Sequence, residues 1–150
     1  MQAPESTAEW VETQINVRRE RRKVLTRDVP TQLWVIVTEG VLYHRVGSAK
    51  LMTEQLDALI EDSRMPNVNL QVLPREDPIN ACLYGPFVIM SFPSSAETDI
   101  VHTDFPTSTL YYEETADVEM YTKLFRRLNM AAANVTKSRA LIADALKEMS

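Results

Sequence analysis

The residue types in this sequence that could transfer protons are His102, Asp104 and Glu39. His102 and Asp104 are two residues apart in a segment that predicts a strand, so alternation along the strand places both side chains on one face. Glu39 follows directly after an apolar segment. Imidazole and carboxylate groups act as acid and base when burial adjusts their pKa values. Each residue also has a structural interpretation, in which Glu39 caps the segment that follows it and His102 packs or faces solvent.

A second group of side chains could line a ligand pocket. Aromatic rings provide apolar walls, and tyrosine hydroxyls provide hydrogen-bonding groups. The candidate ligand-binding residues are Glu39, Tyr43, Arg45, Tyr84, His102 and Tyr112. Arg45 could anchor a ligand carboxylate or could pair with Glu39 instead. Residues of these types are also common in cores, so both a pocket and a packed interior remain open. Cys82, in the same predicted loop as Tyr84, is a candidate nucleophile or an incidental small residue.

Nucleotide loops and metal sites find little support in the sequence. The three glycines stand singly at positions 40, 47 and 85, so neither a GxGxxG nor a Walker motif is present. The two histidines, His44 and His102, lie in different predicted elements, and Cys82 is the single cysteine. Folding could still bring His44, His102 and Asp104 together, but we expect no metal ion and no cofactor. An intrachain disulfide is excluded.

Charge is unevenly distributed along the chain. Lys and Arg number 16 and Asp and Glu number 21, a net charge of −5. Positions 17–27 hold six basic residues against Glu20, so this stretch is +5 and the remainder is −10. The candidate partner-binding residues are Arg18, Arg21 and Arg22, and the basic face could also contact phosphates. A solvated face that balances acidic neighbours is the favoured interpretation, because no aromatic residues interleave for base stacking. The negative net charge of the whole chain disfavours a general nucleic-acid binder, because contacts to phosphates need a positively charged surface.

The size and composition fit one ordinary domain. The chain has 150 residues, of which 45% are hydrophobic, and these are enough to form a core. Residues 1–5 are expected to be disordered and lack the features of a signal peptide. No apolar run approaches the ~20 residues that a membrane-spanning helix needs. We therefore expect a cytoplasmic protein without membrane contact.

Hydrophobic periodicity predicts alternating helices and strands. Helices are predicted over 6–27, 48–63, 116–131 and 136–149, and strands over 33–38, 68–73, 87–92, 100–103 and 109–112. The first strand reads as a central strand that is covered on both faces, and Thr136 or Ser138 as the cap of the last helix. The strand–helix–strand order over 33–73 favours a parallel pair. We predict one α+β domain over 1–150, with a mixed sheet of about five short strands, an N-terminal basic helix, one crossover helix and two C-terminal helices.

The order of these motifs resembles a known family. It is the C-terminal domain of unknown function that follows the helix-turn-helix domain in many actinobacterial XRE-type, antitoxin-like transcription regulators. The closest stretch is Pro-Asn-Val-Asn-Leu-Gln-Val-Leu-Pro at 66–74, which is similar to the family's PNVTVQVLP. The other matching positions are 18–22, 25, 34–39, 42, 45, 47, 52, 55–56, 85–87, 92–93, 127–128, 138–139 and 141–142. Asp77 stands where relatives usually have glycine, and His102 where tyrosine is common, so these regions are expected to differ in ligand or activity.

The resemblance implies a sensory or partner-binding module. Its expected partner is a small protein or a small molecule, and a homodimer is also open. The DNA-binding domain of the regulators is not expected here, and neither is direct nucleic-acid binding. The alternative is a stand-alone family member recruited as a small cofactor-free enzyme of specialised-metabolite biosynthesis. In that case His102, Asp104 and Glu39 would be the acid and base groups of a tyrosine-lined pocket.

Overall fold

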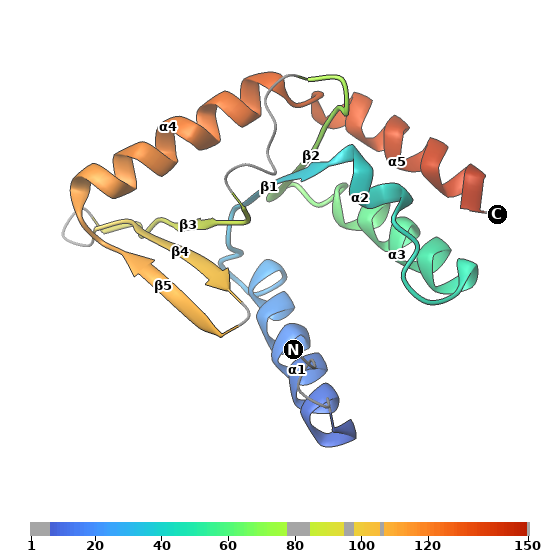
Figure 1. Cartoon of the computed structure of the whole chain (residues 1–150), viewed down its shortest axis with the longest axis horizontal. Helices are drawn as coiled ribbons and strands as arrows, with labels where there is room; N and C mark the ends of the chain where they lie inside the picture. The colour runs from blue at the N-terminus through green and yellow to red at the C-terminus, as the bar shows by residue number, and fades with distance from the viewer. Residues whose placement is uncertain (1–6, 78–84, 95–97, 106, 150) are drawn as a thin grey trace.

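The computed structural model describes residues 7–77, 85–94, 98–105 and 107–149 and has an α+β architecture (Figure 1). Its elements, in chain order, are α1 (Ala8–Arg22), the 3-10 helix η1 (Lys23–Leu25), β1 (Leu33–Thr38), α2 (Glu39–Tyr43), α3 (Ala49–Asp62), β2 (Val68–Leu73), β3 (Val88–Met90), β4 (Ile100–Phe105), β5 (Ser108–Tyr112), α4 (Thr115–Ala131) and α5 (Val135–Met149). The predicted fold class is confirmed. The expectation for residues 1–5 lies outside the described residues.

The five strands form two sheets instead of the single mixed sheet that the sequence suggested. β1 and β2 are parallel, with Leu33 opposite Val68, and α3 lies in the connection between them, as predicted. β3, β4 and β5 form an antiparallel sheet in that order. The second edge of β2 is occupied by the α4–α5 connection, because Ala133 donates its N–H to the Val72 carbonyl (2.9 Å) and Ser138 Oγ accepts from the Val72 N–H (2.9 Å). A third strand therefore cannot join β2.

The main core lies between the parallel sheet and helices α3 and α5. Its buried residues are Leu42, Leu56, Leu70, Val72, Ile142 and Ala145. A smaller cluster, Leu73, Leu124 and Leu128, fixes α4 to the end of β2. α4 continues from this cluster to the antiparallel sheet, where Tyr121 packs on Phe87 of the segment before β3, with ring centroids 5.1 Å apart. The long helix α4 thus bridges the two sheets (Figure 1).

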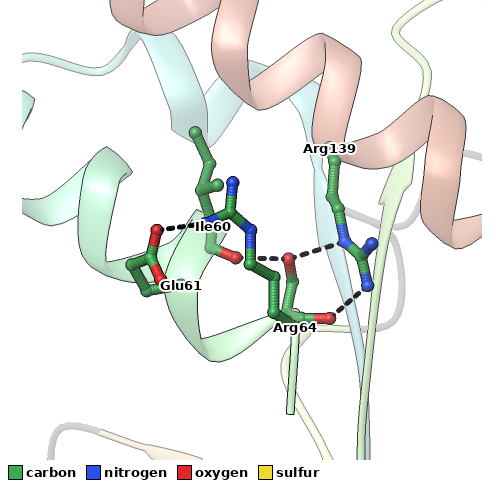
Figure 2. A network of polar contacts seen from close by, with 5 residues as sticks. Ile60, Glu61, Arg64 and Arg139 are labelled. Atoms are coloured by element: carbon green, nitrogen blue, oxygen red, sulfur yellow. Dashed lines mark hydrogen bonds and ion pairs between the residues drawn. The ribbon is translucent and has the colours of Figure 1, made fainter. Parts of the chain in front are cut away.

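Polar groups fasten α3 and α5 together at the end of α3. The Arg139 side chain reaches from α5 to Ser63, with Nε donating to Ser63 Oγ (3.0 Å) and Nη2 donating to the Ser63 carbonyl (2.5 Å) (Figure 2). Ser63 Oγ in turn donates to the Ile60 carbonyl (2.7 Å). Because carbonyls at a helix C-terminus have no intrahelical donors, the guanidinium satisfies groups that would otherwise be left unpaired.

Two local expectations differ from the structure. β1 was expected to be covered on both faces, but it pairs with β2 alone and leaves Trp34 49% exposed. The indole of Trp34 donates to Gln71 Oε1 (2.5 Å) and meets the Phe125 ring edge-on. α5 is capped by Asn134, whose Oδ1 accepts from the Lys137 N–H (2.9 Å), instead of by Thr136 or Ser138. The Ser138 hydroxyl is buried against β2 and is therefore not available as a cap.

Candidate functional site

The most exposed part of the fold is α1. The helix begins as predicted, because Thr7 Oγ1 accepts from the Trp10 N–H (3.2 Å) and caps the first turn. None of its 15 residues is buried. Its far end is fixed to the body where Arg22 pairs with Asp62 (2.5 Å) and Asn67 Nδ2 donates to the Leu25 carbonyl (3.1 Å). From this attachment the helix extends downward from the parallel sheet, to the right of β4 and β5 in the view of Figure 1.

The side chains of α1 are sorted by charge around the helix axis. At roughly 100° per residue, Glu9, Glu12 and Glu20 fall within an arc of about 80°. The opposite arc, about 160° wide, carries apolar and basic residues. We call the exposed set Trp10, Val11, Ile15, Val17, Arg18 and Arg21 the α1 face. Arg22 lies at the edge of this arc and is already paired with Asp62. The three predicted partner-binding arginines are thus on one side, two of them without an ion pair in the described part of the chain.

His102 and Asp104 share one face of β4, as strand alternation predicted. His102 Nδ1 lies 3.8 Å from Asp104 Oδ1, which is too long for a hydrogen bond. This nitrogen is buried and has no hydrogen-bond partner among the described residues. Asp104 Oδ1 accepts instead from the hydroxyl of Thr109 on β5 (2.8 Å), and the imidazole packs beside Tyr111. The two side chains are therefore neighbours that form no hydrogen bond with each other.

Glu39 lies elsewhere, at the first residue of α2, so the structure does not bring it together with His102 and Asp104. Its Oε2 accepts from the Arg75 N–H (2.9 Å), which holds α2 against the segment that follows β2. The guanidinium of Arg75 covers the Tyr43 ring at 4.5 Å from the centroid. Burial, and then the carboxylates of Glu148 and Glu39, raise the pKa of Tyr43, and Arg75 opposes them. Arg45 is exposed and forms no ion pair with Glu39 within the described residues.

The remaining predicted pocket residues are divided between two places. Tyr112 packs under α4 against Tyr121, with centroids 5.4 Å apart, on the sheet face opposite His102. Burial, and then the neighbouring Tyr112, raise the pKa of the Tyr121 hydroxyl. Tyr84 and Cys82 lie outside the described residues. The ligand-binding set therefore does not form one pocket in the part of the chain that the structure describes.

A shallow hollow on α4 was missed by the sequence reasoning. It has a volume of about 330 Å³ and is lined by Thr98, Thr115, Val118, Glu119, Thr122, Lys123 and Arg126. Lys123 is held by Glu119 (3.3 Å). The helical spacing of Thr115, Thr122 and Arg126 could have indicated a polar face, but nothing in the sequence places Thr98 beside it.

Across 7–77, 85–94, 98–105 and 107–149, no three His, Cys, Asp or Glu side chains converge on a point that could bind a metal ion. Within the same ranges, no helix has the length and apolar character to span a bilayer.

Comparison with known proteins gives a family but no activity. No curated protein and no solved structure matches the chain. A family model described as a domain of unknown function, DUF5753, matches residues 1–144, which is nearly the whole chain. The chain therefore belongs to the DUF5753 family of domains of unknown function.

Proposed function

We propose that this chain is a protein-partner-binding domain related to the effector domain of actinobacterial XRE-type transcription regulators, and that the α1 face binds the partner. The observation that carries the proposal is that α1 buries none of its residues in the fold. The order of sequence motifs, which resembles that regulator family, supports the same function.

The physical argument starts from the weak support for α1. An isolated helix of this length is marginal in water, because most helical stability in proteins comes from packing an apolar face. The α1 face exposes Trp10 at 54% together with three branched aliphatic side chains. Covering this surface would stabilise the helix by about 25 cal/mol for each Å² of apolar area removed from water. A partner that covers α1 therefore stabilises both the helix and the complex.

The side chains of the α1 face also indicate the chemistry of the partner. Trp and Arg are the residue types most enriched at the centres of protein interfaces. Arg18 and Arg21 offer bidentate hydrogen bonds to carboxylates, in a setting where the aliphatic residues exclude water. The expected partner is a small protein with an apolar surface and exposed Asp or Glu residues.

The experiment is photo-crosslinking of the full chain in a lysate of the native host, with the photoreactive residue at Ile15. A protein crosslinked at this position is expected, and it should be lost with Arg18→Glu/Arg21→Glu. The matched control, Arg127→Glu/Lys137→Glu, makes the same change of charge on exposed positions of α4 and α5. Crosslinks that persist in the α1 variant, or that are lost equally in the control variant, would contradict the proposal.

A small cofactor-free enzyme of specialised-metabolite biosynthesis is the second candidate function. The observation that favours it is the buried, unpartnered Nδ1 of His102, 3.8 Å from Asp104. In an acid–base role Asp104 would orient the ring through Nδ1, and Nε2 would exchange a proton with the substrate. His102→Gln should abolish turnover of a metabolite of the host's biosynthetic clusters while the fold is retained. Unchanged turnover would remove His102 from this role.

A further inference from the structure

A stable dimer of standard size buries about 800 Å² on each partner. None of the 15 residues of α1 is buried, and its apolar side chains Trp10, Val11, Ile15 and Val17 are between 41% and 54% exposed. The α1 face therefore has apolar surface available for such an interface.

The surface that best complements α1 lies on the antiparallel sheet of the same chain. Positions 76–122, which include β3, β4, β5 and the first turns of α4, hold nine Asp or Glu residues and no Lys or Arg. Positions 17–27 carry a charge of +5. The charges nearest to the two surfaces themselves are Arg18 and Arg21 on α1, and Asp104 on β4 with Glu113 directly after β5. A contact between these groups would be attractive.

One face of the antiparallel sheet carries exposed side chains in the described part of the chain. Val101 and Thr103 of β4 are buried on the face that α4 covers, whereas His102 and Asp104 point to the other side. We call the set Val88, His102, Asp104, Thr109 and Tyr111 the outer sheet face. Tyr111 is 64% exposed on it, and Val88 is also exposed. This face therefore combines apolar area with carboxylate charge, as the α1 face combines apolar area with guanidinium charge.

The C-terminal end of α1 is attached to the α3–β2 side of the fold by the Arg22–Asp62 pair and the Asn67–Leu25 hydrogen bond. From this attachment the helix runs downward in the view of Figure 1, to the right of β4 and β5. No hydrogen bond or ion pair joins α1 to β3, β4 or β5 among the described residues. The lengths of the two surfaces do match, since a 15-residue helix is about 22 Å long and a six-residue strand about 20 Å.

We propose that two copies of this chain form a symmetric dimer in which the α1 face of each copy packs on the outer sheet face of the other. The two contacts are identical by symmetry, so the assembly closes at two chains. This dimer uses the same α1 face as the proposed function and therefore rests on it. In the free protein, the second copy of the chain covers the α1 face. A partner protein would then compete with the second copy for α1.

The experiment is sedimentation velocity of the purified full chain over a wide concentration range. The expected mass is twice 17.1 kDa. The helix variant Arg18→Glu/Arg21→Glu and the sheet variant Asp104→Lys/Glu113→Lys should each be monomeric, because each places like charges across both contacts. A mixture of the two variants should form a heterodimer, because its two contacts both pair opposite charges again. The control Arg127→Glu/Lys137→Glu should remain a dimer.

All substituted side chains are exposed, so far-UV circular dichroism should be unchanged. A photoreactive residue at Ile15 should crosslink to positions 98–113 of a differently tagged copy, which reports the contact without charge reversal. A monomeric parent chain, or two variants that do not associate when mixed, would overturn the dimer. A monomer that still captures a host protein through α1 would overturn the dimer alone, and a dimer that captures none would overturn the proposed function alone.

Discussion

Removing the buried hydroxyl of Ser138 tests how β2 is held against α5. Ser138 is 0% exposed, and its Oγ accepts from the Val72 N–H (2.9 Å) and donates to the Ala133 carbonyl (3.1 Å). In Ser138→Ala the Ala133 carbonyl keeps its hydrogen bond from Gln71 Nε2 (3.0 Å). The Val72 N–H, in a residue that is also 0% exposed, loses its acceptor and stays out of reach of water.

The expected loss in the free energy of unfolding follows from this single unpaired N–H donor. A buried polar group left without a partner costs about 1–3 kcal/mol. The alanine methyl group fills most of the space of the hydroxymethyl group, so no large cavity adds to the cost. In a chain of this size each kcal/mol lowers the melting temperature by about 2–4 °C. A loss of about 2 kcal/mol in the free energy of unfolding therefore lowers the melting temperature by about 4–8 °C.

The assay is urea unfolding followed by circular dichroism, together with hydrogen exchange at the Val72 amide, which should become faster. Thr136→Ala, on the same turn of α5 but exposed, is the matched control and should change stability little. Equal stability of Ser138→Ala and Thr136→Ala would refute the reasoning, because the β2 edge would then not depend on this hydroxyl.

Three further variants test the remaining anchors of the fold. Arg139→Lys keeps the charge but loses the planar fork that binds Ser63, so urea unfolding should show a loss of about 1.5–3 kcal/mol; unchanged stability would contradict the anchoring role. Leu56→Ala opens a cavity between α3 and α5 and should cost about 2–5 kcal/mol by the same assay, whereas Leu51→Ala on the exposed side of α3 should cost much less. The folded-state pKa of Tyr43 is raised, so its contribution to stability is complete below about pH 10 and is lost at higher pH as the unfolded chain ionises first. Tyr43→Phe should therefore unfold less steeply with alkaline pH, and identical pH profiles would contradict the raised pKa.

Local sequence patterns predicted the helices and strands of this fold well where apolar residues recur at a regular spacing along the chain. The pattern of Met52 and Leu56 on one helix face predicted α3 within one residue at each end, because Ser48 also supplies the expected cap. The bounds predicted for the strand at 68–73 match β2. The alternation of apolar and polar residues there also predicted a half-buried strand, and this was wrong, because five of its six residues are buried, including Gln71 at 6% exposure. Such patterns depend on neighbours within one or two turns, and the sequence contains those neighbours directly.

The parallel β1–β2 pair was predicted from the strand–helix–strand order, but the division of the strands into two sheets was not, because it depends on residues far along the chain. The edge of β2 is closed by Ala133 and Ser138, more than 60 residues away, and neither reads as a strand residue. The predicted single sheet failed for this reason. The position of Glu39 shows the same dependence, since its hydrogen-bond partner is the Arg75 N–H and not a residue of the predicted acid–base set.

The separation of basic and acidic residues is evident in the sequence. Which surfaces of the protein carry these charges can be read only from the structure. A basic stretch at 17–27 and an acidic stretch at 76–122 could neutralise each other within one chain if α1 folded back onto the antiparallel sheet. The structure holds the end of α1 elsewhere, because Arg22 pairs with Asp62 on α3 and no hydrogen bond or ion pair joins α1 to β3, β4 or β5 among the described residues. The apolar side chains of the α1 face, and Tyr111 of the outer sheet face, then stay exposed. Opposite charges that are not paired within one chain are available to a second chain, and this favours a binding surface at the α1 face over a solvated helix.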